Sequence, residues 1–203
     1  ESLAHVTPSA FQQVGDEIVL LGECTDELGA SEYLLTVHGL TIGAPPVCDP
    51  AVERRLIDAL LESIHAGVVR SAHDCSDGGL AVALAECAML DRSRQFGFSV
   101  DLSPWALLPH RAVLFGEAHG RVVLSTADSA AVLRIAAQHG VPARVIGRVT
   151  TADAGAQFTI SDDTFRAPVA WLAKAFHEAI PQAMDGETPA EHAVSASHAP
   201  ATD

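Results

Sequence analysis

The chain has 203 residues, 48% of them hydrophobic, and a formal net charge of −14. A domain of this length removes roughly 70% of its unfolded surface from water, so one substantial core can form. The acidic charge and the lack of a basic stripe exclude a nucleic-acid-binding surface, and no apolar run approaches the roughly 20 residues that cross a membrane. We therefore expect a soluble cytoplasmic protein with no nucleic-acid or membrane partner.

Hydrophobic periodicity predicts strands and helices that follow one another along the chain. Their alternation is irregular, which favours a mixed β-sheet with helices on both faces over a doubly wound parallel sheet. We therefore predict an α+β fold with three α/β/α layers. Strands are expected at 17–22, 68–69, 96–101, 120–125, 145–150 and 157–160, and helices at 26–39, 50–65, 80–86, 127–139 and 169–180.

Start and stop signals mark two of these helices. Ser31 is an expected N-cap and Gly39 an expected C-terminal stop for the helix within 26–39. Asp49 followed by Pro50 predicts the start of the next helix, and Gly67 predicts its end.

The composition changes at both ends of the chain. Residues 1–14 show little periodicity and predict a linker from an upstream domain. Residues 184–203 are rich in alanine, serine, proline and acids and hold no lysine or arginine, which predicts a disordered tail. The expected folded domain spans 15–183.

Acids, hydroxyls and glycines gather in the segment SAHDCSDGGL, residues 71–80, between an apolar run and an expected helix. Backbone N–H groups at a helix start favour an anion, and Gly78 and Gly79 would let a phosphate approach the backbone. Asp74 could then hold a hard cation such as Mg²⁺. No lysine follows the glycines, so the segment is not a Walker loop.

A second interpretation of the same segment is structural. Ser76 or Asp77 would cap the helix, and the glycines would permit a tight turn. Cys75 beside His73 also raises the possibility of a thiolate nucleophile, which the flanking carboxylates oppose. The spacing alone does not choose between a cap and a ligand site.

Other polar groups support weaker hypotheses. Glu27, Ser31, Glu32 and Tyr33 indicate either a substrate pocket or domain interface, or a capped and solvated helix start, which is favoured. The four cysteines lack a C-x-x-C pair, so buried thiols are expected rather than a structural zinc site or disulfides. A third set is interpreted as an ion pair or interface contact and comprises Glu117, Arg121 and Arg148.

The segment SAHDCSDGGLAVALAECAM resembles the signature of the last domain of phosphoribosylformylglycinamidine synthase, in its synthetase subunit. Three further segments resemble that family in the same order: GDEIVLLGECTDELGASEYLLTVHGL, LFGEAHGRVVLS and VIGRVT followed by an amphipathic helix. The resemblance covers about residues 10 to 183. Ala30 and Cys75 depart from the usual family residues, and neither departure is expected to abolish the fold.

The resemblance implies an aminoimidazole ribonucleotide synthetase-like C-terminal domain of an ATP-dependent C–N ligase in purine biosynthesis. Formylglycinamide ribonucleotide and glutamine-derived ammonia would become the amidine. The implied cofactors are Mg²⁺ and ATP or ADP. The implied partners are upstream ATP-binding domains of the same polypeptide, a glutaminase subunit and a small accessory subunit.

The resemblance also implies roles for individual residues. Asp74 would bind magnesium and Ser76 the phosphates of a second, non-reacting nucleotide. The pocket would be shaped by His73, Asp77, Gly78 and Gly79. No catalytic residue is expected in this chain, so the chain alone should not turn over substrate.

Two alternatives remain open at this stage. One is a non-catalytic structural module that packs against partner domains. The other is the corresponding domain of aminoimidazole ribonucleotide synthetase, selenophosphate synthetase or thiamine monophosphate kinase, whose signatures fit less well.

Overall fold

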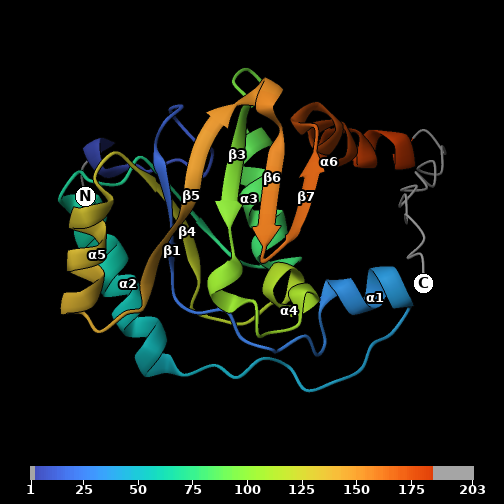
Figure 1. The fold of residues 1–203 in the computed structure, drawn as a ribbon, viewed down its shortest axis with the longest axis horizontal. Helices are drawn as coiled ribbons and strands as arrows, with labels where there is room; N and C mark the ends of the chain where they lie inside the picture. Colours follow the sequence, from blue (N-terminus) through green and yellow to red (C-terminus); the bar gives the residue numbers. More distant parts are fainter. Residues whose placement is uncertain (1–2, 185–203) are drawn as a thin grey trace. The chain divides into compact units, whose positions relative to one another are not determined.

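A seven-stranded mixed sheet organises residues 3–173 in the computed structural model, which describes residues 3–184 (Figure 1). The strand order is β2-β4-β1-β5-β3-β6-β7. Neighbouring strands run antiparallel except β3 and β6, which are parallel, so the predicted mixed sheet is confirmed. The strands are β1 (Glu17–Leu21), β2 (Ser71–Asp74), β3 (Phe96–Asp101), β4 (Val122–Thr126), β5 (Ala143–Thr151), β6 (Ala156–Ile160) and β7 (Asp163–Ala167).

Helices cover both faces of the sheet, which confirms the three-layer prediction. Helices α2 and α5 pack on one face, and α3 and α4 pack on the other, where the first turns of α6 also join the core. The helices are α1 (Glu32–His38), α2 (Pro50–His65), α3 (Gly79–Met89), α4 (His110–Phe115), α5 (Ser129–Gln138) and α6 (Val169–Met184), with short 3₁₀ turns η1 (Leu3–His5), η2 (Ser103–Trp105) and η3 (Ala152–Ala154).

Strand β1 shows how the sequence produces the layers. Because successive side chains of a strand point to opposite faces, Ile18 and Leu20 join the α3 side while Val19 and Leu21 join the α2 side. All four are fully buried. Each such side chain contributes roughly 1.5–3 kcal/mol by leaving water. A run that is apolar at every position therefore predicts a central strand covered on both faces.

The helix signals are mostly confirmed. The Ser31 hydroxyl accepts a hydrogen bond from the Leu34 N–H, and Gly39 ends α1 in the left-handed region at φ 65°. The Asp49 carboxylate accepts from the Ala51 N–H at 2.8 Å and begins α2. The helix predicted from residue 26 starts only at Glu32, because the capping serine fixes where the first turn forms.

The strand predicted at 68–69 is wrong by several residues. Val68 and Val69 are partly buried against the α2-side core, but the ladder with β4 begins at Ser71, opposite Ser125. Two further elements escaped prediction. Helix α4 has only six residues, and β7 is an exposed edge strand without an apolar stripe.

The beginning of the chain is partly integrated into the domain. Phe11 is fully buried, and its N–H donates to the Cys87 carbonyl at 2.7 Å. The Pro8 carbonyl accepts from the Ala72 N–H at 2.9 Å, beside strand β2. Residues 8–11 therefore pack on the domain, while a linker role for 1–14 stays a prediction.

The end of the chain divides at residue 174. Residues 3–173 belong to one unit, and Lys174 onward to a second unit that begins with the remainder of α6. The tail predicted at 184–203 lies, from residue 185, outside the described residues. Within residues 3–184, no helix has the length and apolar character needed to cross a membrane.

Candidate functional site

The segment 71–80 forms a strand-to-helix junction at the edge of the sheet. Strand β2 ends at Asp74, and the next N–H, from Cys75, still donates to the Arg121 carbonyl at 3.0 Å. The Ser76 carbonyl accepts from the Gly79 N–H at 3.0 Å as helix α3 begins. The predicted junction therefore exists, and the motif itself supplies its strand.

Three of the six predicted site residues face one cavity of about 570 Å³. Asp74, Ser76 and Asp77 are exposed and line this cavity. They are joined there by polar side chains from other segments, namely Glu53, Glu117, His119 and Arg121. We call this space the junction cavity. A ligand site at Asp74 and Ser76 has the open surroundings that it requires.

The other three predicted residues lie elsewhere. His73 precedes Asp74 in the strand and lies on the opposite side, where its Nε2 is 3.2 Å from a carboxylate oxygen of Glu86. Gly79 is buried, and Gly78 lines a separate apolar hollow with Tyr33 and Phe115 among its walls. These three residues therefore support the strand-to-helix junction but do not line the junction cavity.

Electrostatics in the junction cavity favour a cation. The Ser76 hydroxyl donates a hydrogen bond to Asp74, and this bond is the main reason that the pKa of Asp74 falls below its usual 3.8. Asp74 is therefore ionised at neutral pH. The one guanidinium among the lining residues, Arg121, is buried and donates to the carbonyls of Ala118 and Gly116. A phosphate would thus meet mostly carboxylates, unless a metal ion accompanied it.

The interpretation of Ser76 or Asp77 as a helix cap is wrong. Gly78 occupies the N-cap position, and no side chain of that residue can cap the helix. Instead, the Glu117 carboxylate accepts from the Gly78 N–H and from the Glu32 N–H, both at 2.9 Å. A carboxylate from a distant loop therefore fills the place where an anion would bind.

Packing within the protein itself requires glycine at positions 78 and 79, whether or not a ligand binds. Gly78 and Gly79 have φ values of 78° and 67°. A Cβ on Gly79 would lie 2.4 Å from the Gly116 carbonyl oxygen, and one on Gly78 would lie 2.4 Å from a methyl carbon of Val82. The protein's own backbone, rather than a phosphate, makes the close approach here.

The ion pair expected within the set Glu117, Arg121 and Arg148 does not form among these three residues, and the alternative, an interface contact, stays a prediction. Glu117 binds backbone N–H groups, and Arg121 donates to carbonyl oxygens and approaches the Cys24 sulfur at 3.9 Å. Arg148 pairs instead with Glu17 at 3.9 Å.

The cluster around Glu32 is a capped helix start, as favoured. Ser31 is buried as the N-cap, and Glu27 accepts from the Val47 N–H at 2.9 Å. Tyr33 stacks on Phe115 with ring centroids 5.1 Å apart. These contacts fix α1 against the loop that carries Glu117.

The cysteines are free, and three of them are shielded. Burial raises the pKa of Cys75 to about 12, which removes the thiolate nucleophile hypothesis. Burial likewise raises the pKa of Cys24 and Cys87. The expectation of buried thiols fails at Cys48, which is exposed.

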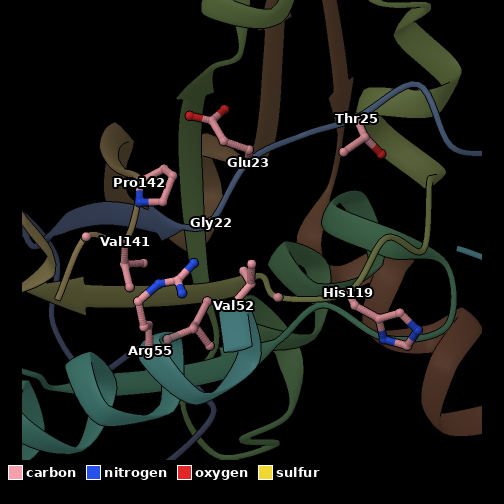
Figure 2. Close-up of a pocket in the computed structure, with 11 residues that line it drawn as sticks. Gly22, Glu23, Thr25, Val52, Arg55, His119, Val141 and Pro142 are labelled. Carbon is pink, nitrogen blue, oxygen red and sulfur yellow. The ribbon is translucent and has the colours of Figure 1, made fainter. Parts of the chain in front are cut away.

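A second hollow lies beside the junction cavity (Figure 2). It has a volume of about 350 Å³, and its walls include Arg55 and Val141. His119 lines both spaces. Figure 2 shows its imidazole directed away from Arg55, Val141 and Pro142. None of the predicted site residues lines this hollow.

Sequence reasoning missed Glu53 and His119 as cavity residues. Glu53 is an ordinary first-turn acid of α2, and His119 is one of ten scattered histidines. The only available signal was the position of His119 in the segment LFGEAHGRVVLS. Their meeting depends on the tertiary fold.

Residues 13–158 match the family described as AIR synthase related protein, C-terminal domain. The chain belongs to this family. The AIR synthase related C-terminal domain is also the fold that the sequence resemblance implied, and that resemblance is confirmed.

Several curated relatives of this chain are PurL subunits of phosphoribosylformylglycinamidine synthase. The phosphoribosylformylglycinamidine synthase subunit PurL of Symbiobacterium thermophilum is 40% identical over 91% of this chain and 25% of its own length. Solved structures of T. maritima PurL complexed with FGAR and with ATP, each 24% identical, cover 84% of this chain with TM-scores of 0.70 and 0.68, and 30% and 28% of those chains. The chain thus spans about a quarter of the length of the curated relatives it matches.

Proposed function

We propose that this chain is the C-terminal domain of a phosphoribosylformylglycinamidine synthase. The whole enzyme would convert formylglycinamide ribonucleotide, ATP and glutamine-derived ammonia to the amidine in purine biosynthesis. The observation that carries this proposal is the 40% identity to a PurL subunit over 91% of the chain. A cytoplasmic location accords with free thiols and with this metabolism.

The domain's part in the reaction is nucleotide binding and support rather than covalent chemistry. Transfer of a phosphoryl group to the amide oxygen depends on positioning and on neutralising phosphate charge. Asp74 is ionised, exposed and set in an oxygen-rich cavity, which suits a Mg²⁺ ion. Ser76 would contact the phosphates of ATP or ADP, with Asp77 at the cavity wall. Bound Mg²⁺ would supply the positive charge that these phosphates need beside Glu117.

His73, Gly78 and Gly79 act indirectly in this proposal. The contact of His73 with Glu86 ties strand β2 to helix α3, and the close approach of Gly79 to Gly116 holds the helix start against the next loop. Asp74 and Ser76 are thereby presented from a fixed turn.

Asp74→Asn in the full-length protein tests the metal and nucleotide site. We expect the affinity for Mg²⁺-ADP, measured by calorimetry, to fall at least tenfold. Asp91→Asn is the matched control, because Asp91 also accepts a hydrogen bond from a serine two residues later but lies outside the cavity. Unchanged binding in Asp74→Asn would refute the site while leaving the family membership intact.

The isolated chain should yield no product from formylglycinamide ribonucleotide, ATP and ammonia, whereas the full-length enzyme should. No catalytic residue is proposed in this chain. Turnover by the isolated chain, measured as amidine formation, would overturn this division of labour.

Partner domains have an apolar surface available to them. Leu35, Val37, Ile42 and Val47 on α1 and the loop after it are 49%, 59%, 57% and 79% exposed. We propose that upstream domains of the same polypeptide cover this surface, in an assembly that also includes the glutaminase and small accessory subunits. The same surface supports a second candidate, a purely structural module, which unchanged nucleotide binding in Asp74→Asn would favour.

A further inference from the structure

Three side chains of metal-binding types meet at the rim of the junction cavity. The Cys48 thiol, the Glu53 carboxylate and the His119 imidazole have ligand atoms within 4.8 Å of one another. Cys48 ends the loop before helix α2, Glu53 lies in the first turn of that helix, and His119 lies in the loop between α4 and β4. Segments far apart in the sequence thus bring sulfur, oxygen and nitrogen donors to one point.

Backbone contacts hold the segments that carry these residues. The Asp49 carbonyl accepts from the Glu53 N–H at 3.0 Å, which fixes the spacing between Cys48 and the helix. A Cβ on Gly120 would lie 3.0 Å from Glu53 Oε1, so the carboxylate reaches across to the loop that carries His119. The juxtaposition is therefore built by the helix cap and by the glycine beside His119.

The three side chains are not used by the rest of the described structure. Within residues 3–184, the Cys48 thiol, the Glu53 carboxylate and the His119 imidazole make no hydrogen bond or ion pair. Other histidines beside acids behave differently: His139 Nε2 lies 2.7 Å from Glu62 and pairs with it directly. At the Cys48 cluster the three ligand atoms converge to within 4.8 Å of one another without pairing.

We propose that Cys48, Glu53 and His119 bind a Zn²⁺ ion, with water as the fourth ligand. Zinc accepts thiolate, imidazole and carboxylate ligands in tetrahedral geometry, and thiolate excludes Mg²⁺ and Ca²⁺ as preferred ions. Ligands at about 2.0–2.3 Å from such an ion lie roughly 3.3–3.8 Å apart. The ligand atoms, now within 4.8 Å of one another, would have to approach by about 1 Å, and the exposed side chains of Cys48 and His119 are free to change rotamer.

A zinc ion bound at Cys48, Glu53 and His119 would connect two loops of the domain. Glu53 and His119 also line the junction cavity, and Cys48 belongs to the loop that joins α1 to α2. Figure 2 shows the imidazole directed away from Arg55 and Pro142, which lie on the other side of the neighbouring hollow. A zinc ion here would fasten the loop before α2 to the loop after α4, at the mouth of the cavity that holds Asp74.

Zinc binding to the full-length, tag-free protein tests the proposal without nucleotide. Calorimetry of the wild type should show one Zn²⁺ site of micromolar or tighter affinity. Cys48→Ser and His119→Asn should each weaken this affinity at least tenfold. Cobalt(II) should give a thiolate-to-metal absorption band that Cys48→Ser abolishes. Both substitutions are at exposed positions, and circular dichroism without metal confirms the fold of each variant.

The matched control is His139→Asn combined with Glu62→Gln, which removes a half-buried histidine and an acid of the same α2 helix. This control should leave zinc affinity and the cobalt band unchanged. Equal weakening in the control, or zinc binding unaltered by Cys48→Ser, would overturn the site.

Discussion

Three turns of this protein share the sequence pattern Asp-x-Ser, at Asp74, Asp91 and Asp101, and the first two of them have very different surroundings. In one, the Ser76 hydroxyl donates to the Asp74 carboxylate. In the other, the Ser93 hydroxyl and N–H both donate to Asp91, at 2.6 and 2.9 Å. The serine hydrogen bond is the main cause that lowers the aspartate pKa in each turn.

The difference lies in what the fold places opposite each turn. Asp74 lines the junction cavity with Glu117 and His119, whereas Asp91 follows the end of α3 on the surface. The residue between the partners also differs, since Cys75 is shielded and Arg92 is exposed. A local hydrogen bond and a lowered pKa therefore do not identify a site. The surrounding tertiary structure does.

The largest expected difference between the two turns is the reactivity of a thiol placed between the aspartate and the serine. The pKa of Cys75, about 12, leaves roughly a thousandfold less thiolate at pH 8 than an ordinary cysteine has. In Arg92→Cys, the new thiol of the surface turn should be alkylated by iodoacetamide while Cys75 stays unmodified. Mass spectrometry of peptides from the folded protein measures both rates. Comparable rates would show that the two turns are equally open.

Gly79→Ala should destabilise the protein by about 3 kcal/mol, because it combines a left-handed φ with a clash against a backbone carbonyl. Gly140→Ala is the control: Gly140 has a φ of 65°, but a Cβ there meets nothing within 4 Å, so only about 1–2 kcal/mol should be lost. Urea denaturation measures both. Equal losses of stability in the two variants would mean that the close contact of Gly79 with Gly116 does not hold the first turn of α3.

Glu117→Ala should cost about 2 kcal/mol of stability, because it leaves the Gly78 and Glu32 N–H groups without their charged acceptor. Glu117→Gln keeps an acceptor oxygen and should lose about half as much. Thermal unfolding distinguishes the two variants. If Glu117→Ala is as stable as the wild type, water must replace the Glu117 carboxylate as hydrogen-bond acceptor without loss of stability.

The smallest effect is expected from Ser76→Ala, which should return the pKa of Asp74 toward 3.8. Because the folded pKa is lowered, the hydrogen bond stabilises the protein above pH 3.8 and loses this effect as pH falls through the lowered value. For so exposed a group the loss at pH 7 should be about 0.5 kcal/mol and vanish in acid. Carboxyl NMR titration gives the pKa, with Ser93→Ala and Asp91 as the parallel case.

The fold could largely be predicted because burial periodicity is a local property. Ile18 to Leu21 predicted a buried strand, and Ser31 and Asp49 marked helix starts through short-range hydrogen bonds. Strand β7 could not be predicted, since its pairing with β6 rather than its own pattern makes it a strand.

The site was predictable only in part for the same reason. Asp74, Ser76 and Asp77 stand together in the sequence and do share a cavity. Glu53 and His119 reach it from other elements, and Glu117 takes a backbone-binding role that no spacing revealed. Whether Asp74 and Ser76 bind metal and nucleotide stays a prediction.

The place of β1 in the sheet has a consequence for how the chain folds. Val19 pairs with Leu124 on one side and with Val145 on the other, so the first strand must wait for partners that come late in the chain. Such distant pairing slows folding and leaves an apolar strand edge uncovered meanwhile. Polypeptides truncated before β5 should therefore aggregate during synthesis instead of forming a smaller sheet.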